Sequence, residues 1–284
     1  MSYIQLLISV ILLAANFSFR RVYTKKAGDT FRASVYYSFF AAIICAVFFL
    51  ALGGGKISLN PFTVLMASAS AIMCLAYTAL SFKIMEEDGL AVFTLFLMAG
   101  GMTVPYIFGI AFLHEEFSLL RTFGLVLIFA SLLTVNSGCG KINPKTAAMC
   151  IAVFLLNGFV SVVSKLHQIS LYAAAENDFI ICTYIVQALM CLAAFPLVRG
   201  KQPLPINSPR CITAIIASAL AGGISYLLQL VCAKSLPATV LYPAVTGGSV
   251  VLTSLCGIII FKEKAHAKLL IGIGLCFMGT CMFL

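Results

Sequence analysis

Ten long apolar segments are the feature that most limits how this chain can fold. Each is about 17 to 25 residues long, enough for an α-helix to cross a hydrocarbon core of roughly 30 Å. The apolar residues run continuously and do not alternate, which argues against membrane β-strands. With 62% hydrophobic and 10% charged residues, the chain has too little polar surface to cover a soluble globule of 284 residues. We place the segments at 2–23, 31–53, 61–85, 90–113, 117–136, 144–168, 177–198, 211–234, 238–261 and 266–284. The sequence predicts an all-α, multi-pass integral protein of the cytoplasmic membrane.

The end of the chain repeats its middle at a constant offset of 148 positions. The matching pairs are Gly100 and Gly248, Gly109 and Gly257, Glu115 and Glu263, Gly124 and Gly272, Leu127 and Leu275, and Phe129 and Phe277. Because five crossings are an odd number, a second half of five helices must lie upside down relative to the first. We therefore predict a 5+5 inverted-topology repeat, with halves 1–138 and 139–284 in one integrated membrane domain. Such repeats are typical of alternating-access transporters.

The basic residues indicate the orientation in the membrane. The net charge is +9, and the odd-numbered connections carry fourteen Lys and Arg residues. The even-numbered connections carry only Lys56, Arg121, Lys165 and Lys234. Under the positive-inside rule, the odd connections lie in the cytoplasm and both termini lie outside. We interpret the charge as a topology signal and expect no nucleic-acid partner.

No motif for catalysis or metal binding is present. The sequence contains neither HExxH nor GxSxG, and every Asp and Glu lies at a helix end or in a loop. His114, His167 and His266 also lie at helix ends, where we expect solvated interface residues. We therefore predict that the protein is not an enzyme and that it binds no cofactor or metal. A non-transporting membrane scaffold or partner subunit remains the alternative to a transporter, and the oligomeric state is open.

The ending of each half resembles a known family. An apolar helix ends in Phe, a short loop carries Glu, and a Gly follows nine residues after that Glu. These positions are Phe112, Glu115 and Gly124, and then Phe261, Glu263 and Gly272. This pattern is similar to that of the drug/metabolite transporter superfamily, specifically its EamA-like family. The resemblance implies ten helices, solute efflux, and a central cavity enclosed by the third, fourth, eighth and ninth helices, with the first and sixth nearby.

Four of these helices carry a stripe of small or polar residues on one face, at spacings of i, i+4, i+7 and i+11. Polar groups on such a stripe avoid lipid, so they face protein or water. Close helix packing explains small residues equally well, and this alternative stays open. The stripes and the neighbouring amides and phenols give the candidate substrate-binding residues: Asn16, Tyr77, Thr78, Thr94, Met98, Asn157, Ser225, Tyr226, Gln229, Tyr242, Thr246 and Ser249.

A proline and a glycine pair occur in each of the fourth and ninth segments. A proline removes a helical hydrogen bond and a glycine pair tolerates bending, so these positions are candidate hinges, although a static kink fits them as well. The hinge residues are Gly100, Gly101, Pro105, Pro243, Gly247 and Gly248.

The positions of the Asp and Glu residues indicate a mode of transport. No carboxylate lies at mid-membrane, which argues for facilitated diffusion, exchange, or coupling through an interfacial residue. A neutral or zwitterionic solute, such as an amino acid or a drug-like compound, then fits better than a dication. We expect Glu115 and Glu263 to anchor helix ends. The sequence thus predicts a secondary transporter that exports a small organic solute across the lipid bilayer by alternating access.

Overall fold

The computed structural model describes the backbone of residues 2–27, 31–87, 90–135, 144–198, 208–262 and 267–283, with the side chains at 81–83, 85–87, 90–94, 135 and 197 left out. Within these ranges the chain forms ten α-helices and one short 3-10 helix. They are α1 (Ser2–Ala27), α2 (Phe31–Leu52), α3 (Pro61–Glu87), α4 (Leu90–Phe112), α5 (Leu119–Val135), α6 (Pro144–Ile169), α7 (Glu176–Ala194), η1 (Phe195–Val198), α8 (Pro209–Ser235), α9 (Ala238–Ile259) and α10 (Ala267–Cys281).

The ten predicted helices are all present, with small changes at their ends. α1 continues four residues beyond the predicted end, where Lys25 and Lys26 stabilise the negative end of the helix dipole. α7 gives way to the tighter η1 at Phe195, next to Pro196, which cannot donate a backbone hydrogen bond. Eight helices are long and apolar enough to cross a membrane, whereas α5 and α10 are shorter. The fold is that of a multi-pass membrane protein.

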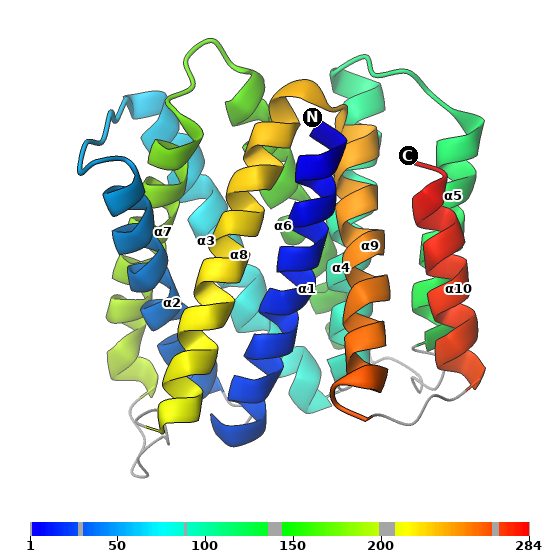
Figure 1. The fold of residues 1–284 in the computed structure, drawn as a ribbon, viewed down its shortest axis with the longest axis horizontal. Coiled ribbons are helices and arrows are strands. Elements are labelled where there is room, and N and C mark those ends of the chain that lie inside the picture. Colours follow the sequence, from blue (N-terminus) through cyan, green and yellow to red (C-terminus); the bar gives the residue numbers. More distant parts are fainter. Residues whose placement is uncertain are drawn as a thin grey trace.

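The helices stand side by side and alternate in direction (Figure 1). Both termini lie at one end of the bundle, which we call the terminal end, and the other is the opposite end (Figure 1). The main packed pairs are α1 with α8, α4 with α6, α3 with α6, α2 with α7, and α5 with α10. α9 packs against α1, α4 and α10 and so joins the centre of the bundle to the outer α5 and α10.

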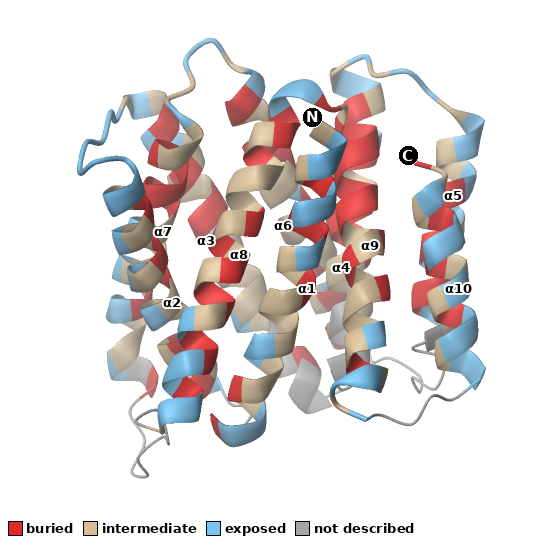
Figure 2. Ribbon diagram, in the orientation of Figure 1, coloured by how far each residue is buried: buried red, intermediate tan, exposed pale blue. Residues whose placement is uncertain are grey.

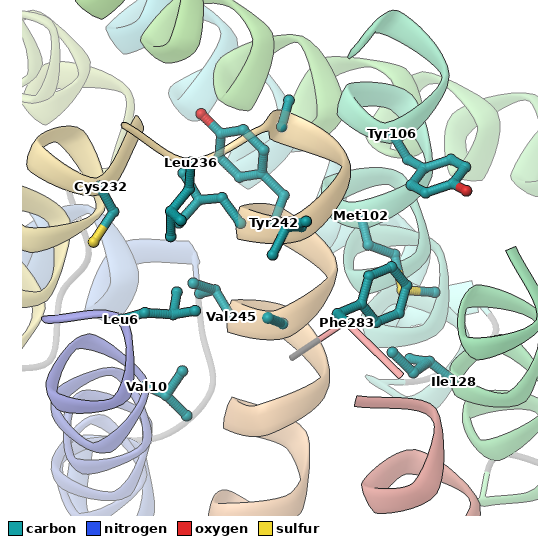
Figure 3. Packing of buried hydrophobic residues seen from close by; sticks show 14 of the residues in the cluster. Leu6, Val10, Met102, Tyr106, Ile128, Cys232, Leu236, Tyr242, Val245 and Phe283 are labelled. Atoms are coloured by element: carbon teal, nitrogen blue, oxygen red, sulfur yellow. The ribbon is translucent and has the colours of Figure 1, made fainter. Parts of the chain in front are cut away.

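Side chains around α9 form a large apolar core. Leu6 and Val10 of α1 meet Met102 of α4 and Val245 of α9 in this cluster (Figure 3). The outward faces of the bundle instead carry exposed large apolar side chains, as expected for contact with lipid. Buried positions gather toward the terminal end of α9, while exposed positions are common at the opposite end (Figure 2).

Glycine allows one close crossing at the centre. A Cβ on Gly158 of α6 would lie 2.8 Å from the carbonyl oxygen of Gly100 on α4, and a Cβ on Gly100 would overlap the backbone of Phe154. The two helices therefore touch backbone to backbone, as small residues permit in membranes.

Candidate functional site

A buried lysine holds the turn between α8 and α9 at the terminal end. Lys165 on α6 is 6% exposed. Its Nζ donates hydrogen bonds to the carbonyl oxygens of Ala233 and Leu236, each at 2.6 Å. A helix leaves its last carbonyls without intrahelical donors, and its C-terminus attracts a cation. Lys165 thus fastens α6 to the C-terminus of α8.

Glu115 holds the other side of the same turn. Its carboxylate accepts the backbone N–H of Ala238 at 2.6 Å and that of Thr239 at 2.8 Å. These are the first donors of α9, which has no side-chain cap from its own preceding residue. A Cβ on Gly109 would lie 2.6 Å from Oε2 of Glu115, so the glycine leaves room for the carboxylate. Glu115 also interacts electrostatically with Lys165.

An aromatic sandwich fills the terminal end beside α3, α6 and α7. The imidazole of His167 stacks between the rings of Phe62 and Phe179, with centroids 5.8 Å and 4.2 Å away. Its Nε2 lies 2.9 Å from the Thr63 hydroxyl. His167 is fully buried, so the expectation of a solvated interface residue was wrong for it. A sequence position near a helix end does not reveal which neighbouring helix covers it.

The predicted amides on α1 and α6 each bind a carbonyl of another helix. Asn16 donates to the carbonyl oxygen of Ser218 on α8, and Asn157 donates to that of Leu97 on α4, both at 2.7 Å. A Cβ on Gly222 would lie 2.5 Å from Nδ2 of Asn16. Each amide therefore marks a place where small neighbours allow two helices to be joined by a polar contact.

Four tyrosines converge at the centre from four different helices. The phenol groups of Tyr77 (α3), Tyr184 (α7) and Tyr242 (α9) each lie near that of Tyr226 (α8). We call these residues the tyrosine cluster. Tyr77, Tyr184 and Tyr226 are half-buried, whereas Tyr242 is buried.

Hydrogen bonds tie the tyrosine cluster to α6. The hydroxyl of Tyr226 pairs with that of Ser164 at 2.8 Å. Tyr242 donates to the carbonyl oxygen of Ser161 at 2.7 Å, while its ring belongs to the apolar core (Figure 3). Lys165 follows Ser164 directly, so a movement of α6 would displace both the tyrosine cluster and the α8–α9 turn.

The remaining candidate residues have varied surroundings. Gln229 donates to the Ser225 hydroxyl at 3.2 Å, and Ser225 is itself buried against Ser9 of α1. Thr78 and Ser249 each hydrogen-bond a carbonyl of their own helix. Met98 packs against the apolar core, and Thr246 is half-buried on α9, where its carbonyl oxygen accepts the hydrogen bond from Ser249. The side chain of Thr94 lies outside the described residues.

The candidate hinge glycines occupy helix crossings. Gly101 leaves room for the amide of Asn157, and Gly248 meets Val10 of α1. Gly247 faces Thr280 of α10. Pro105 and Pro243 lie inside α4 and α9 as predicted from the sequence. Close packing is thus one role of these glycines, and bending during a conformational change stays a prediction.

Two residues of the candidate site were not predicted from the sequence. Lys165 is grouped with the loop residues by the charge pattern alone, although it is buried within α6. Tyr184 lies on α7, a helix without a polar stripe in the sequence. Its pairing with Tyr226 depends on packing between α7 and α8, which no local pattern records.

Comparisons with known proteins support the fold and leave the family open. No protein-family model matches the sequence, and no curated protein matches it. Among 28 matching chains of solved structures is one described as "Crystal structure of protein", which superposes with a TM-score of 0.79. The match covers 99% of this chain and 95% of that chain at 14% sequence identity. This similarity shows a shared fold and carries no statement about activity.

Proposed function

We propose that this protein is a secondary transporter of the cytoplasmic membrane, which exports a small organic solute by alternating access. The observation that carries the proposal is the tyrosine cluster, a half-buried polar centre inside a bundle of apolar helices. Polar groups inside a membrane bundle pair with one another or with backbone carbonyls, and they commonly mark the path of a solute or ion. Resemblance of the repeat endings to the EamA-like family points to the same function.

The packing of the helices supports a 5+5 inverted repeat. If each helix of the first repeat (α1–α5) is exchanged with its counterpart in the second (α6–α10), the pair α1–α8 becomes the pair α6–α3. The pair α1–α9 likewise becomes the pair α6–α4. All four pairs are packed in the structure. α2 with α7, α4 with α9 and α5 with α10 convert into themselves. α1 runs away from the terminal end and α6 runs toward it, as inversion requires (Figure 1). Transporters with inverted repeats bind their solutes between the repeats.

The two ends of the bundle suggest how access alternates. Glu115 and His167 join helices of the two proposed repeats at the terminal end, and Lys165 fastens α6 to α8 within the second repeat. At the opposite end, exposed lysines of α1 make the contacts with the second repeat: Lys26 donates to the Ser208 hydroxyl, and Lys25 lies over the ring of Phe261. We infer a conformation closed at the terminal end, which is the outer side under the positive-inside rule. Opening that side by movement of one repeat against the other would require the start of α9 to leave Glu115.

The experiment that tests the proposal is solute flux in liposomes that contain only this protein. Candidate solutes come from a stabilisation screen of amino acids, sugars, nucleosides, organic acids and cationic drugs, since a ligand of the folded state raises its melting temperature. Saturable uptake of a stabilising solute is expected. Absence of flux for every stabilising solute would favour the alternative, a non-transporting scaffold or partner subunit.

A further inference from the structure

We propose that Arg20 forms an anion-binding subsite next to the tyrosine cluster, and that the solute is a small organic acid with one carboxylate. This inference rests on the proposed transport function and names its substrate class. It changes the expectation of a neutral or zwitterionic solute, which followed from the absence of a carboxylate at mid-membrane.

Arg20 points toward the interior of the bundle. It lies on the same face of α1 as Ser9 and Asn16, and both of those contact α8. Its guanidinium carbon lies 5.2 Å from the ring centroid of Tyr37, a buried residue of α2. The Tyr37 hydroxyl in turn donates to Ser218 of α8. The charge is therefore held against the inner side of α2 and α8.

The charge of Arg20 also reaches across to α3. It lies near Cys74 and Tyr77, although α1 and α3 share no extensive interface in the described part of the chain. Tyr77 interacts in turn with Tyr226, which places the subsite at one border of the tyrosine cluster.

Arg20 lacks an acidic partner among the described residues. Its side chain is exposed even though the Tyr37 ring beside it is buried. The Tyr77 hydroxyl forms a hydrogen bond with the Cys74 thiol at 3.2 Å. A guanidinium and a phenol are donors that suit a carboxylate, and the planar guanidinium can bind both of its oxygens.

The number of cations favours one negative charge. Lys165, the buried lysine nearest the tyrosine cluster, is engaged by two carbonyl oxygens and by Glu115. Arg20 would therefore supply the charge that balances the solute. A phosphate monoester carries a charge of about −1.5 to −2 at pH 7, which would leave part of its charge unbalanced in an apolar surround. The rings of Tyr77 and Tyr226 provide surface for an aromatic or aliphatic body.

The test measures binding of three probes of similar size to the purified protein in lipid nanodiscs. Benzoate is the monoanion, benzamide its neutral counterpart and phenyl phosphate the dianion. Calorimetric titration should give the tightest binding for benzoate. Arg20→Gln should weaken benzoate binding about tenfold to a hundredfold, since a hydrogen-bonded charge is lost. The affinity of Arg20→Lys for benzoate should lie between that of the unmodified protein and that of Arg20→Gln, because lysine keeps the charge without the planar guanidinium.

Arg21→Gln is the matched control. Arg21 is the next residue of α1, and its guanidinium lies over the ring of Phe261, on a different side of the helix. This variant loses the same charge and should bind benzoate like the unmodified protein. Equal binding of benzoate and benzamide, tighter binding of phenyl phosphate, or equal loss in both Gln variants would overturn the inference. If Arg20→Gln fails to fold, the relative affinities of the unmodified protein for the three probes still test the inference.

Flux in liposomes separates this inference from the proposed function. Arg20-dependent flux of benzoate would support both. Flux of neutral solutes alone, unchanged in Arg20→Gln, would leave the transporter proposal standing and refute the subsite. Arg20-dependent binding of benzoate without flux of any solute would support the subsite and refute transport.

Discussion

Replacing Glu115 with alanine removes a cap that one segment of the chain supplies to a distant helix. The carboxylate holds two backbone N–H groups at the start of α9. A hydrogen bond to a charged group contributes about 1.5 to 3 kcal/mol, and loss of an ordinary N-cap costs about 0.5 to 2 kcal/mol. Glu115 is half-buried, so water can satisfy part of what is lost. We expect a loss of about 2 kcal/mol in the free energy of unfolding.

Thermal unfolding of the purified protein measures this loss. A change of about 2 kcal/mol should lower the melting temperature by roughly 4 to 8 °C. Glu115→Gln should cost less, because an amide oxygen still accepts hydrogen bonds, and solute exchange should remain measurable in this variant. Gly109→Ala should lower the melting temperature as well, since its methyl group would displace the carboxylate.

Glu116→Ala provides the control for this prediction. Glu116 is the adjacent acid, is exposed, and has no hydrogen-bond or ionic partner in the described part of the chain. Its loss should change stability by no more than about 0.5 kcal/mol. If Glu115→Ala and Glu116→Ala melt at the same temperature, the cap has no energetic importance. If Glu115→Gln folds but abolishes exchange, Glu115 is a coupling residue and not an anchor.

Three further predictions concern packing, the central site and orientation. Gly100→Ala should destabilise the protein by about 1 to 3 kcal/mol because its Cβ would overlap the backbone of Phe154. Gly274→Ala is the control, since no atom lies within 4 Å of its added Cβ, and it should not destabilise the protein. Equal melting temperatures of the two variants would contradict the close crossing of α4 and α6. Gln229→Leu should keep the fold and lower solute affinity roughly tenfold to a hundredfold, and Tyr242→Phe should weaken binding less than Tyr242→Ala because the ring keeps its place in the core; normal transport by Gln229→Leu would assign its stripe to packing. A cysteine replacing Lys25 should resist an impermeant thiol reagent in intact cells, and one replacing Lys56 should react; the reverse pattern would invert the orientation and leave the fold unchanged.

The sequence predicted the helices well because hydrophobic length is a local property. Proline and the dipole of a helix end account for the shifts at Phe195 and Lys25. Long-range contacts account for what the sequence missed. Lys165 and His167 lie close to the end of an apolar segment, and only the packing of α3, α7 and α8 around them makes them buried.

The polar stripes give candidate residues of a central site for a similar reason. Helical periodicity places Gln229 and Tyr242 on stripes of their own helices, with Tyr226 beside one of them, and their part in solute binding stays a prediction. Tyr184 and Arg20 were not among these candidates, because their proposed roles depend on which helix stands opposite. A charge near a helix end has the same local pattern whether it fixes orientation or faces a central space.

Exchange across a liposome membrane tests alternating access most directly. A carrier with one central site must return before it carries again, so unlabelled solute on the far side should accelerate entry of labelled solute. The solute would be the strongest ligand from the stabilisation screen, in liposomes that contain only this protein. We expect saturable entry that rises severalfold with solute on the far side. Entry that is linear in solute concentration and unaffected by the far side, or no entry at all, would contradict transport by alternating access.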